Sequence, residues 1–367
     1  MKGVRYSYLS QQFADCDDLW SELKSFVATG DFTLGAPLQI FEKEFARLIG
    51  SDFAVGVNSG TDAIKLSLVA AGVGYGDEVI TTANTFVATV GAIAEIGAKP
   101  VFVDCCDTFC MDTSQIESAI TEKTKALVPV HFAGYMSDMR EVNRIADKYD
   151  LVVVEDACQA ILGNIDGKNS GTWGLTGAFS LHPLKNLNVW SDGGVIVTDS
   201  EDIYLKLKLL RNHGLIDRDT VGILGYNSRL DTIQAVVGNW LIGDAQSISD
   251  NRIRNASRLD DGLASINQIT LPPRPSDMRI VYHLYMVHAE NRDNLLDHCL
   301  SKGIEAKVHY PVPIYAQPAL GTYGYGASGV FENADNQAKS LISFPCDQHL
   351  NDEQIDYIVA AVREFYL

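Results

Sequence analysis

Lys185 is the residue whose position most suggests covalent chemistry. It lies in the stretch 178–186 (AFSLHPLKN), after a β-like segment and a proline. This pattern predicts a turn, from which an ammonium group can point into a cleft rather than into solvent. Partial burial or a neighbouring cation would lower the lysine pKa, and the neutral amine could then form a Schiff base with an aldehyde. An isolated lysine after a proline is more often a solvated surface group, so the other motifs must decide.

Asp156 is the acid with the strongest case for a functional role. It belongs to the motif 155–159 (EDACQ), which closes the very apolar stretch 151–154. A carboxylate at the end of a buried strand costs free energy unless it is paired, so such an acid is a candidate for a site. The alternative, that Asp156 is the N-cap of a following helix, stays equally open at this stage.

Two further motifs follow predicted strands. Residues 58–62 (NSGTD) lie between a strand at 53–57 and a helix expected to begin at Ala63. A small, flexible turn that opens a helix offers free backbone N–H groups, which suit a phosphate. The simpler interpretation is a plain helix cap with Thr61 or Asp62 as the N-cap residue. Phe86 follows the strand at 78–82 and could stack on a flat heteroaromatic ring, although a lone phenylalanine is usually part of a core.

These motifs lie along a stretch in which predicted strands and helices alternate. Valine- and isoleucine-rich strands alternating with amphipathic helices predict a mainly parallel sheet that is covered on both faces. In such sheets, ligands collect at the carboxyl ends of the strands. We expect helices at 14–28, 38–49, 62–71, 87–96 and 138–148, and strands at 53–57, 78–82, 100–103, 126–130, 151–155 and, later, 284–289.

Composition narrows the class of protein. The chain has 367 residues, of which 46% are hydrophobic and 21% charged, which suits one large domain with a smaller one appended. A net charge of −18 argues against binding to nucleic acid. We expect no membrane span and a cytoplasmic protein, because no apolar run is long enough. Seven cysteines fit reduced thiols, and Cys105, Cys106 and Cys110 beside Asp104 and Asp107 are expected to be core or loop thiols rather than metal ligands.

The order of these signals resembles the sugar aminotransferases of pyridoxal phosphate (PLP) fold type I, which are aspartate-aminotransferase-like. The resemblance rests first on SGTD (59–62), the aromatic Phe86, EDACQA (155–160), FSLHPLKN (179–186) and DGG (192–194). It continues through LRNHG (210–214), GYNSRLD (225–231), VHYPVP (308–313) and SFP (343–345). It covers nearly the whole chain. Each motif is short, but so many in the same order make a chance match improbable.

The resemblance implies a role for each matching residue. Lys185 would form the Schiff base with PLP and act as its acid and base, and Asp156 would keep the pyridine nitrogen protonated. Gln159 would lie against the ring hydroxyl and Phe86 would stack on the ring. The phosphate would be held by Gly60, Thr61 and Ser180, joined by Asn227 from the second subunit of a homodimer. The substrate side would be lined by Arg229, His309 and Tyr310. No metal is implied.

The resemblance also implies a large α/β PLP-binding domain over 1–245 and a smaller α+β domain over 246–367. The reaction would transfer an amino group from L-glutamate, or alternatively L-glutamine, to a keto-sugar, for a surface polysaccharide such as lipopolysaccharide or for a natural product. The sugar would be nucleotide-linked, or instead a keto-octulosonate. Tyr315, where many members have histidine, and the segment 188–190 leave the sugar and the aminated carbon open. The alternatives are a PLP-dependent sugar dehydratase, which has histidine in place of the lysine, and a non-catalytic PLP-binding regulatory protein.

Overall fold

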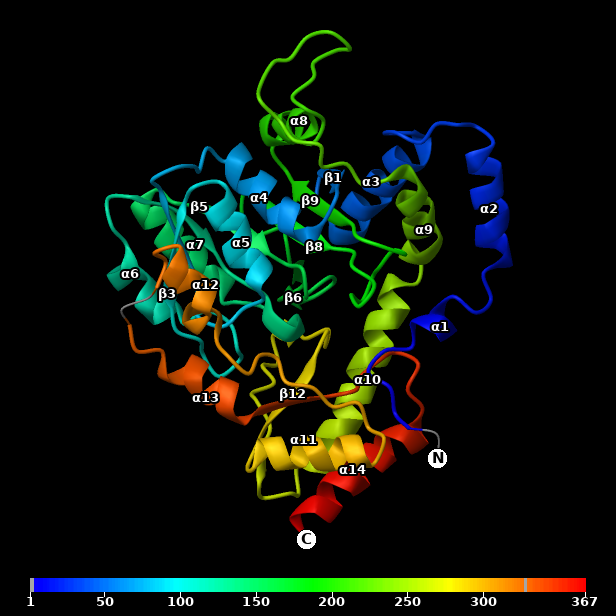
Figure 1. The fold of residues 1–367 in the computed structure, drawn as a ribbon, viewed down its shortest axis with the longest axis vertical. Coiled ribbons are helices and arrows are strands. Elements are labelled where there is room, and N and C mark those ends of the chain that lie inside the picture. The colour runs from blue at the N-terminus through cyan, green and yellow to red at the C-terminus, as the bar shows by residue number, and fades with distance from the viewer. Residues whose placement is uncertain (1–2, 327–328) are drawn as a thin grey trace.

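A seven-stranded sheet forms the centre of the computed structural model, which describes residues 3–326 and 329–367 (Figure 1). The strand order is β1-β9-β8-β5-β4-β2-β3. The strands from β8 to β3 pair in parallel, whereas β9 is antiparallel to both of its neighbours. The strands are β1 (Phe53–Val57), β2 (Glu78–Thr82), β3 (Lys99–Val103), β4 (Thr124–Val128), β5 (Val152–Asp156), β8 (Thr176–Ser180) and β9 (Gly194–Thr198). The predicted mainly parallel sheet is confirmed.

Side chains of this sheet alternate between two hydrophobic clusters, one on each face. Val195 and Val197 of β9 belong to one cluster, and Ile196 belongs to the other. The first face is covered by α2 (Asp17–Val27), α3 (Ala36–Ile49), α7 (Met139–Tyr149) and α9 (Thr232–Ile242). The second face is covered by α4 (Gly60–Ala70), α5 (Val87–Glu95) and α8 (Glu201–Leu210). Burial on both faces explains why these strands are nearly continuous apolar runs in the sequence.

The packing of α3 illustrates how one helix is held. Its apolar positions recur at helical spacing, and Phe41 and Phe45 are fully buried. The Phe45 ring meets Phe179 of β8 edge-on at 5.3 Å. Each such side chain stabilises the fold by roughly 1.5–3 kcal/mol through burial. Gly50 ends the helix in the left-handed conformation that favours glycine.

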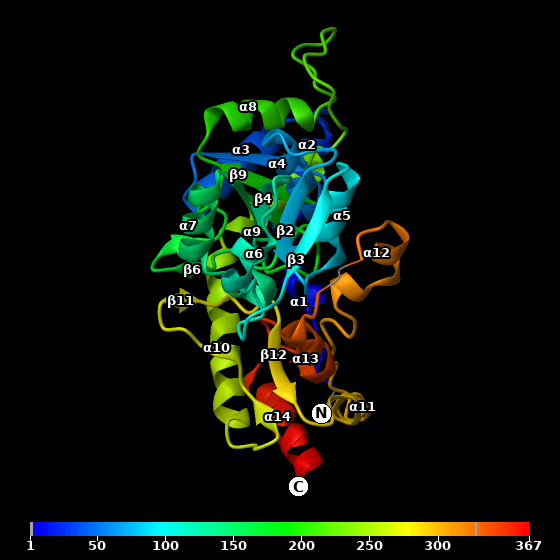
Figure 2. The same ribbon diagram turned by 90° about the vertical axis from the view of Figure 1, so that its left-hand side faces the viewer.

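The C-terminal part packs below this sheet around a second, smaller one, as Figures 1 and 2 show. The antiparallel strands β10 (Ile269–Thr270), β12 (Tyr285–Ala289) and β13 (Leu341–Phe344) lie against α10 (Ala245–Leu263), α11 (Arg292–Ser301) and α14 (Asp352–Tyr366). The N-terminal arm joins this core, because Val4 pairs with Ile304 and Tyr8 is buried there.

Shorter elements connect these parts. They are α1 (Leu9–Gln12), η1 (Thr113–Gln115), α6 (Ile116–Ala119), η2 (Phe132–Gly134), η3 (Ile314–Ala316), α12 (Pro318–Thr322) and α13 (Glu332–Ser340). A third small sheet pairs β6 (Asn164–Ile165) with β7 (Lys168–Asn169) and β11 (Met278–Arg279). The predicted elements are found, and their ends agree or differ by at most three residues. For example, β4 and β5 begin at Thr124 and Val152.

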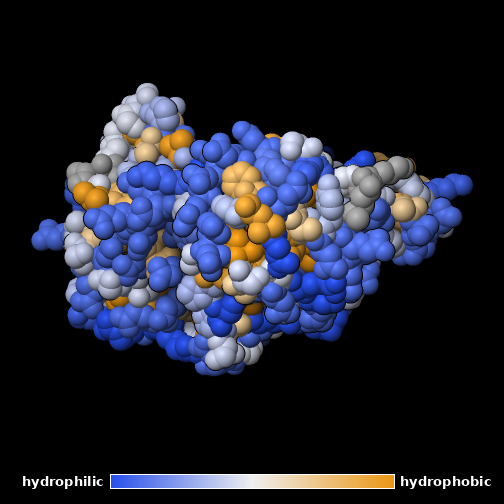
Figure 3. All heavy atoms as spheres, turned by 90° about the horizontal axis from the view of Figure 1, so that it is seen from below, coloured by the Kyte–Doolittle hydropathy of each residue, from blue (hydrophilic) through white to orange (hydrophobic). Residues whose placement is uncertain are grey.

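Figure 3 shows a mainly hydrophilic surface with a group of hydrophobic residues near the middle of the face viewed. None of the helices in residues 3–326 and 329–367 is long and apolar enough to cross a membrane. Over the same ranges, no group of three or more His, Cys, Asp or Glu side chains could hold a metal ion. Asp104, beside the clustered cysteines, instead accepts backbone hydrogen bonds from Asn333 and Ala334 at 2.9 Å and so caps α13.

Candidate active site

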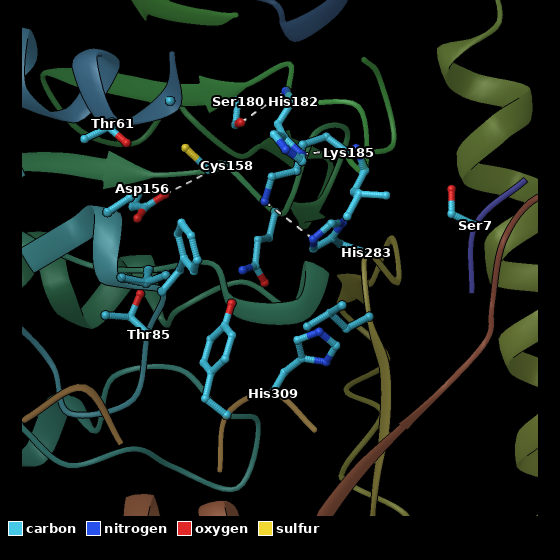
Figure 4. A pocket seen from close by; sticks show the side chains of 18 of the residues that line it. Ser7, Thr61, Thr85, Asp156, Cys158, Ser180, His182, Lys185, His283 and His309 are labelled. Atoms are coloured by element: carbon cyan, nitrogen blue, oxygen red, sulfur yellow. Dashed lines mark hydrogen bonds between the residues drawn. The ribbon is translucent and has the colours of Figure 1, made fainter. Parts of the chain in front are cut away.

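A cavity of about 460 Å³ lies where the carboxyl ends of the central strands meet the C-terminal part of the chain. One wall is formed by the ends of β5 and β8, the start of α4 and the loop that carries Lys185. The facing wall is formed by His283 and His309 (Figure 4). Tyr310, next to His309 in the sequence, also lines the cavity. The cavity therefore occupies the position at which ligands bind in open parallel sheets.

Lys185 extends from a turn into this cavity, as the sequence predicts. Its backbone N–H donates to the His182 carbonyl at 2.8 Å. The loop is held from outside, since the Asn186 amide donates to the Val281 carbonyl at 2.9 Å. Burial lowers the pKa of Lys185 below its usual value, and nearby Cys158 and Asp156 oppose that shift only in part. A larger fraction of the lysine is therefore the neutral amine that a nucleophile requires.

Asp156 ends β5 and is 5% exposed. One carboxylate oxygen accepts a hydrogen bond from Thr89 Oγ1 at 2.7 Å, and the other accepts from the Cys158 backbone N–H at 3.2 Å. The residues after Asp156 form turns, so the alternative that Asp156 is a helix N-cap is wrong. Within the described residues no Lys, Arg or His forms a salt bridge with it. A buried carboxylate without a cation is the partner that a protonated ring nitrogen would need.

The first turn of α4 forms a cradle of backbone N–H groups. The helix begins at Gly60, not at Ala63, and its N-cap is Ser59, which accepts from the Asp62 N–H at 3.1 Å. The interpretation with Thr61 or Asp62 as N-cap is therefore wrong. A Cβ on Gly60 would lie 2.7 Å from the Ser180 Cβ, which shows how closely α4 approaches β8. Only glycine, which has no Cβ, allows α4 to approach β8 this closely. The free N–H groups at the start of the helix suit a phosphate.

Phe86 and Gln159 lie on the wall between the strand ends and the C-terminal part. Phe86 precedes α5, is 50% exposed, and its ring centroid is 6.1 Å from that of Tyr310. Gln159 is buried, and its side-chain oxygen accepts from the Ala133 backbone N–H at 2.7 Å. An aromatic face left half exposed in a cavity can stack on a flat ring. Phe86 is therefore not simply a core residue.

His309 and Tyr310 are brought to the cavity from 124 and 125 positions beyond Lys185 in the sequence. His309 Nδ1 hydrogen-bonds Ser343 Oγ at 2.8 Å. Burial, with the charges of Lys307 and Lys185, lowers the pKa of His309 to about 4, so its imidazole is neutral at pH 7. Burial and the charge of Asp156 raise the pKa of Tyr310, which keeps its hydroxyl protonated. Both side chains can therefore form hydrogen bonds without carrying charge.

Asn227 and Arg229 do not line this cavity. They line a separate cavity of about 320 Å³ together with residues such as Asn58 and Asp231. Arg229 donates to the Asn212 side chain at 2.9 Å. The single chain thus brings together nine of the eleven predicted site residues: Gly60, Thr61, Phe86, Asp156, Gln159, Ser180, Lys185, His309 and Tyr310.

Three residues in or next to the cavity, Thr85, Thr89 and His283, have roles that sequence analysis did not identify. Thr89 orients Asp156, and its hydroxyl is 2.9 Å from that of Thr85, four positions earlier. That spacing places both threonines on one side of the α5 start, which is the only signal the sequence offered. His283 Nε2 lies 3.5 Å from Lys185 Nζ, across 98 positions of sequence. No local pattern around His283 indicated that contact.

Comparison with known families bears on this geometry. The model of the DegT/DnrJ/EryC1/StrS aminotransferase family matches residues 16–363. The chain belongs to that family. As a family member it shares 38% identity over 362 residues with the "Pleiotropic regulatory protein" of Geobacillus stearothermophilus, covering 98% of this chain and 97% of that one. It is also 38% identical to the dTDP-3-amino-3,4,6-trideoxy-alpha-D-glucose transaminase of Streptomyces venezuelae, over 92% of this chain and 89% of that one.

Solved structures of the aminotransferase fold agree with these matches. The crystal structure of S. venezuelae DesV in complex with a ketimine intermediate superposes with a TM-score of 0.96 at 35% identity, covering 100% of this chain and 99% of that one. The structure of Bacillus subtilis NtdA with bound cofactor PMP gives a TM-score of 0.93 at 30% identity, covering 99% and 85%. The predicted PLP fold type I is confirmed, and PLP is the cofactor of this family member.

The residues of this aminotransferase fit that cofactor. The Gly60 cradle can accept a phosphate, and the uncompensated Asp156 carboxylate can accept a ring N–H⁺. Lys185 offers a neutral amine, and Phe86 offers an aromatic face. PLP, when bound, supplies an electron sink for a carbanion next to the reacting nitrogen. The residues of the chain would hold the phosphate, keep the ring nitrogen charged and provide the lysine that moves protons.

Proposed function

We propose that this PLP-dependent aminotransferase transfers the amino group of L-glutamate to carbon 3 of a nucleotide-linked keto-sugar. The observation that carries the proposal is that Lys185 and Asp156 line one cavity, the first with a lowered pKa and the second buried without a cation. That pair distinguishes transamination from dehydration, because the dehydratase alternative has histidine instead of lysine. The similarity to a dTDP-3-amino-sugar transaminase supports the choice of carbon and of nucleotide.

We infer the cofactor contacts from the same cavity. Lys185 would carry the Schiff base and transfer the proton, and Asp156, oriented by Thr89, would hold the ring nitrogen. Gly60, Thr61 and Ser180 would bind the phosphate through backbone N–H and hydroxyl groups. Phe86 would stack on the ring, and Gln159 would lie beside the ring hydroxyl.

We infer that the sugar and its phosphates bind against the C-terminal wall. His309 and Tyr310 are neutral hydrogen-bonding groups there, which suits sugar hydroxyls. Lys307 is exposed at the cavity, and its Nζ lies 4.5 Å above the Tyr6 ring. A chain with a net charge of −18 repels anions in general, so a local cation of this kind supports binding of a phosphorylated ligand.

We propose a homodimer in which Asn227 and Arg229 of one subunit complete the site of the other. Their segment, between α8 and α9, extends beyond the body of the subunit (Figure 1). Leu224 is 93% exposed and Ile216 is 63% exposed on that segment. Apolar side chains projecting into solvent support a partner surface. We also propose that 1–245 and 246–367 act as two domains, because α10 begins at Ala245 and the cavity lies between the two parts.

The test uses the reverse reaction. Purified protein with PLP is given 2-oxoglutarate and a nucleotide-linked 3-amino sugar, and glutamate is measured. We expect glutamate from this sugar and none with Lys185→Ala. An 8-amino octulosonate in parallel tests the unlinked alternative. PLP binding without amino transfer from any sugar would overturn the proposal and favour a regulatory role, to which the name of the Geobacillus relative points.

A further inference from the structure

The assigned roles leave His283 unexplained, although it is the polar group that contacts the Lys185 amine. Its Nε2 atom lies 3.5 Å from Nζ, at the long end of the hydrogen-bond range (Figure 4). His283 immediately precedes Leu284 and β12, so the C-terminal part of the chain delivers it to the reacting atom of the large domain.

Several hydrogen bonds hold the segment 281–284, and three of them come from different parts of the chain. The Asn186 amide, next to Lys185, donates to the Val281 carbonyl at 2.9 Å. The Arg252 guanidinium of α10 donates to the Tyr282 carbonyl at 3.1 Å. The Leu284 N–H donates to the Ala133 carbonyl at 3.2 Å. The loop that carries Lys185 therefore also holds the segment that carries His283, which keeps the two side chains close together.

The backbone of this segment is strained. Tyr282 has a φ of +46°, in the left-handed region that a bulky residue rarely adopts. Its N–H packs so closely on Gly134 that a Cβ there would approach within 2.7 Å. Such conformations cost on the order of 1–3 kcal/mol and persist where surrounding contacts enforce them, often at functional sites. The surrounding contacts thus maintain an unfavourable backbone conformation at Tyr282, the residue before His283.

The protonation state of His283 follows from its surroundings. Burial lowers its pKa well below the usual value, and the charges of Lys185, Arg252, His309 and His182 lower it further. Asp156 and Cys158 face Lys185 from β5 and the turn after it, and have no such effect on His283. The imidazole is therefore neutral and carries one proton.

The position of that proton follows from burial. His283 Nδ1 is buried and has no hydrogen-bond partner in the described part of the chain. A buried N–H without an acceptor is rarer and more costly than a buried acceptor without a donor. The favoured tautomer therefore has its proton on Nε2, facing Nζ. A hydrogen bond donated from Nε2 toward Nζ can be accepted only by the lone pair of a neutral amine.

We infer that His283 donates a hydrogen bond from Nε2 to the neutral amine of Lys185 and so holds the lysine in its nucleophilic, deprotonated form. No bond to carbon forms or breaks in this step, and the proton remains on Nε2. Its value to catalysis rests on the proposed function, but the contact itself can be tested separately from turnover. It would act whenever Lys185 is free, which includes the capture of PLP.

The test measures the lysine directly in PLP-free protein. Competitive acetylation across a pH series, followed by peptide mass spectrometry, gives the titration midpoint of Lys185, with exposed Lys24 of α2 as the internal reference. His283→Phe removes the donor and retains a ring. We expect its Lys185 midpoint to rise by about one pH unit, which is about a tenfold loss of neutral amine at a fixed pH.

His309→Phe is the matched control, because it removes a second neutral imidazole of the same cavity that bonds Ser343 instead of Lys185. Its effect on the Lys185 midpoint should be smaller than that of His283→Phe. A fall of the midpoint in His283→Phe would overturn the inference, since it would mean that Lys185 donates to Nε2. Unchanged midpoints would also overturn it.

A second measurement covers the case in which His283→Phe does not fold. In wild-type protein labelled with ¹⁵N-histidine, the imidazole shifts report which nitrogen is protonated. We expect a proton on Nε2 of His283, with assignment by His283→Gln. A proton on Nδ1, or a doubly protonated ring at pH 7, would overturn the inference. Failure of amino transfer to any sugar, with these results intact, would count against the proposed function alone.

Discussion

The two walls of the cavity are built in different ways. The strand-end wall consists of the ends of β5 and β8 and the start of α4, packed so closely that even a methyl group on Gly60 would meet Ser180. The facing wall consists of loop residues, His283, His309 and Tyr310, whose imidazoles and hydroxyl carry no charge. The first wall suits a cofactor that stays bound, and the uncharged hydrogen-bonding groups of the second suit the hydroxyl groups of a keto-sugar. The strand-end wall would thus carry the chemistry and the facing wall the choice of sugar. Substitutions in the two walls should therefore affect different steps.

Lys185→Ala should have the largest effect, because among residues 3–326 and 329–367 it removes the only amine that lines the strand-end wall. We expect loss of the visible Schiff-base absorption band of the PLP-loaded protein and a fall in turnover on the order of a thousandfold or more. Lys24→Ala, on exposed α2, is the control and should change neither. A Lys185→Ala protein that retained full turnover would contradict the mechanism.

Asp156→Asn should leave folding intact, since an amide oxygen can still accept from Thr89. Turnover should fall on the order of a hundredfold, which is about 2.7 kcal/mol, because a neutral amide cannot keep the ring nitrogen protonated. Thr89→Val removes the hydroxyl donor only and should cost about tenfold. Measuring kcat gives the loss of catalysis in each variant, and measuring thermal unfolding shows whether the fold is also destabilised. Near wild-type kcat in Asp156→Asn would reject its electronic role.

Gly60→Ala tests the cradle. The added methyl would meet Ser180 at 2.7 Å and the Cys158 sulfur at 2.9 Å. We expect the affinity for PLP, measured by titration of the apo-protein, to fall by about tenfold or more. Gly91→Ala is the matched control, because nothing lies within 4 Å of its added methyl and alanine favours the α5 helix by roughly 1 kcal/mol. Equal affinities in both variants would argue against phosphate at this helix start.

Subunit mixing should give the smallest effect and tests whether the strand-end wall, with its phosphate-binding residues, is complete in one chain. Lys185→Ala and Asn227→Ala proteins are each expected to be weak, and hybrid dimers would contain one intact site if Asn227 serves the partner. We therefore expect activity to rise above either parent after subunit exchange. If exchange is confirmed by mass and activity does not rise, Asn227 acts within its own chain or not at all.

Much of the strand-end wall could be predicted because its signals are local. A buried apolar strand that ends in Asp156, and a small turn that opens a helix at Gly60, each occupy only a few consecutive residues. Strand periodicity then indicated that these ends share one edge of the sheet. The errors were also local: the N-cap is Ser59, and a turn rather than a helix follows Asp156.

The sequence by itself therefore determined the sheet class, the aminotransferase family and most of the residues that line the cavity, because each depends on short-range pattern. Only the tertiary structure decided which side chains meet Lys185 and Asp156. His283 reaches the lysine across 98 residues, and Thr89 reaches the carboxylate from α5 across 67. Such contacts depend on how separate elements pack and on a strained backbone at Tyr282, neither of which has a signature in consecutive residues.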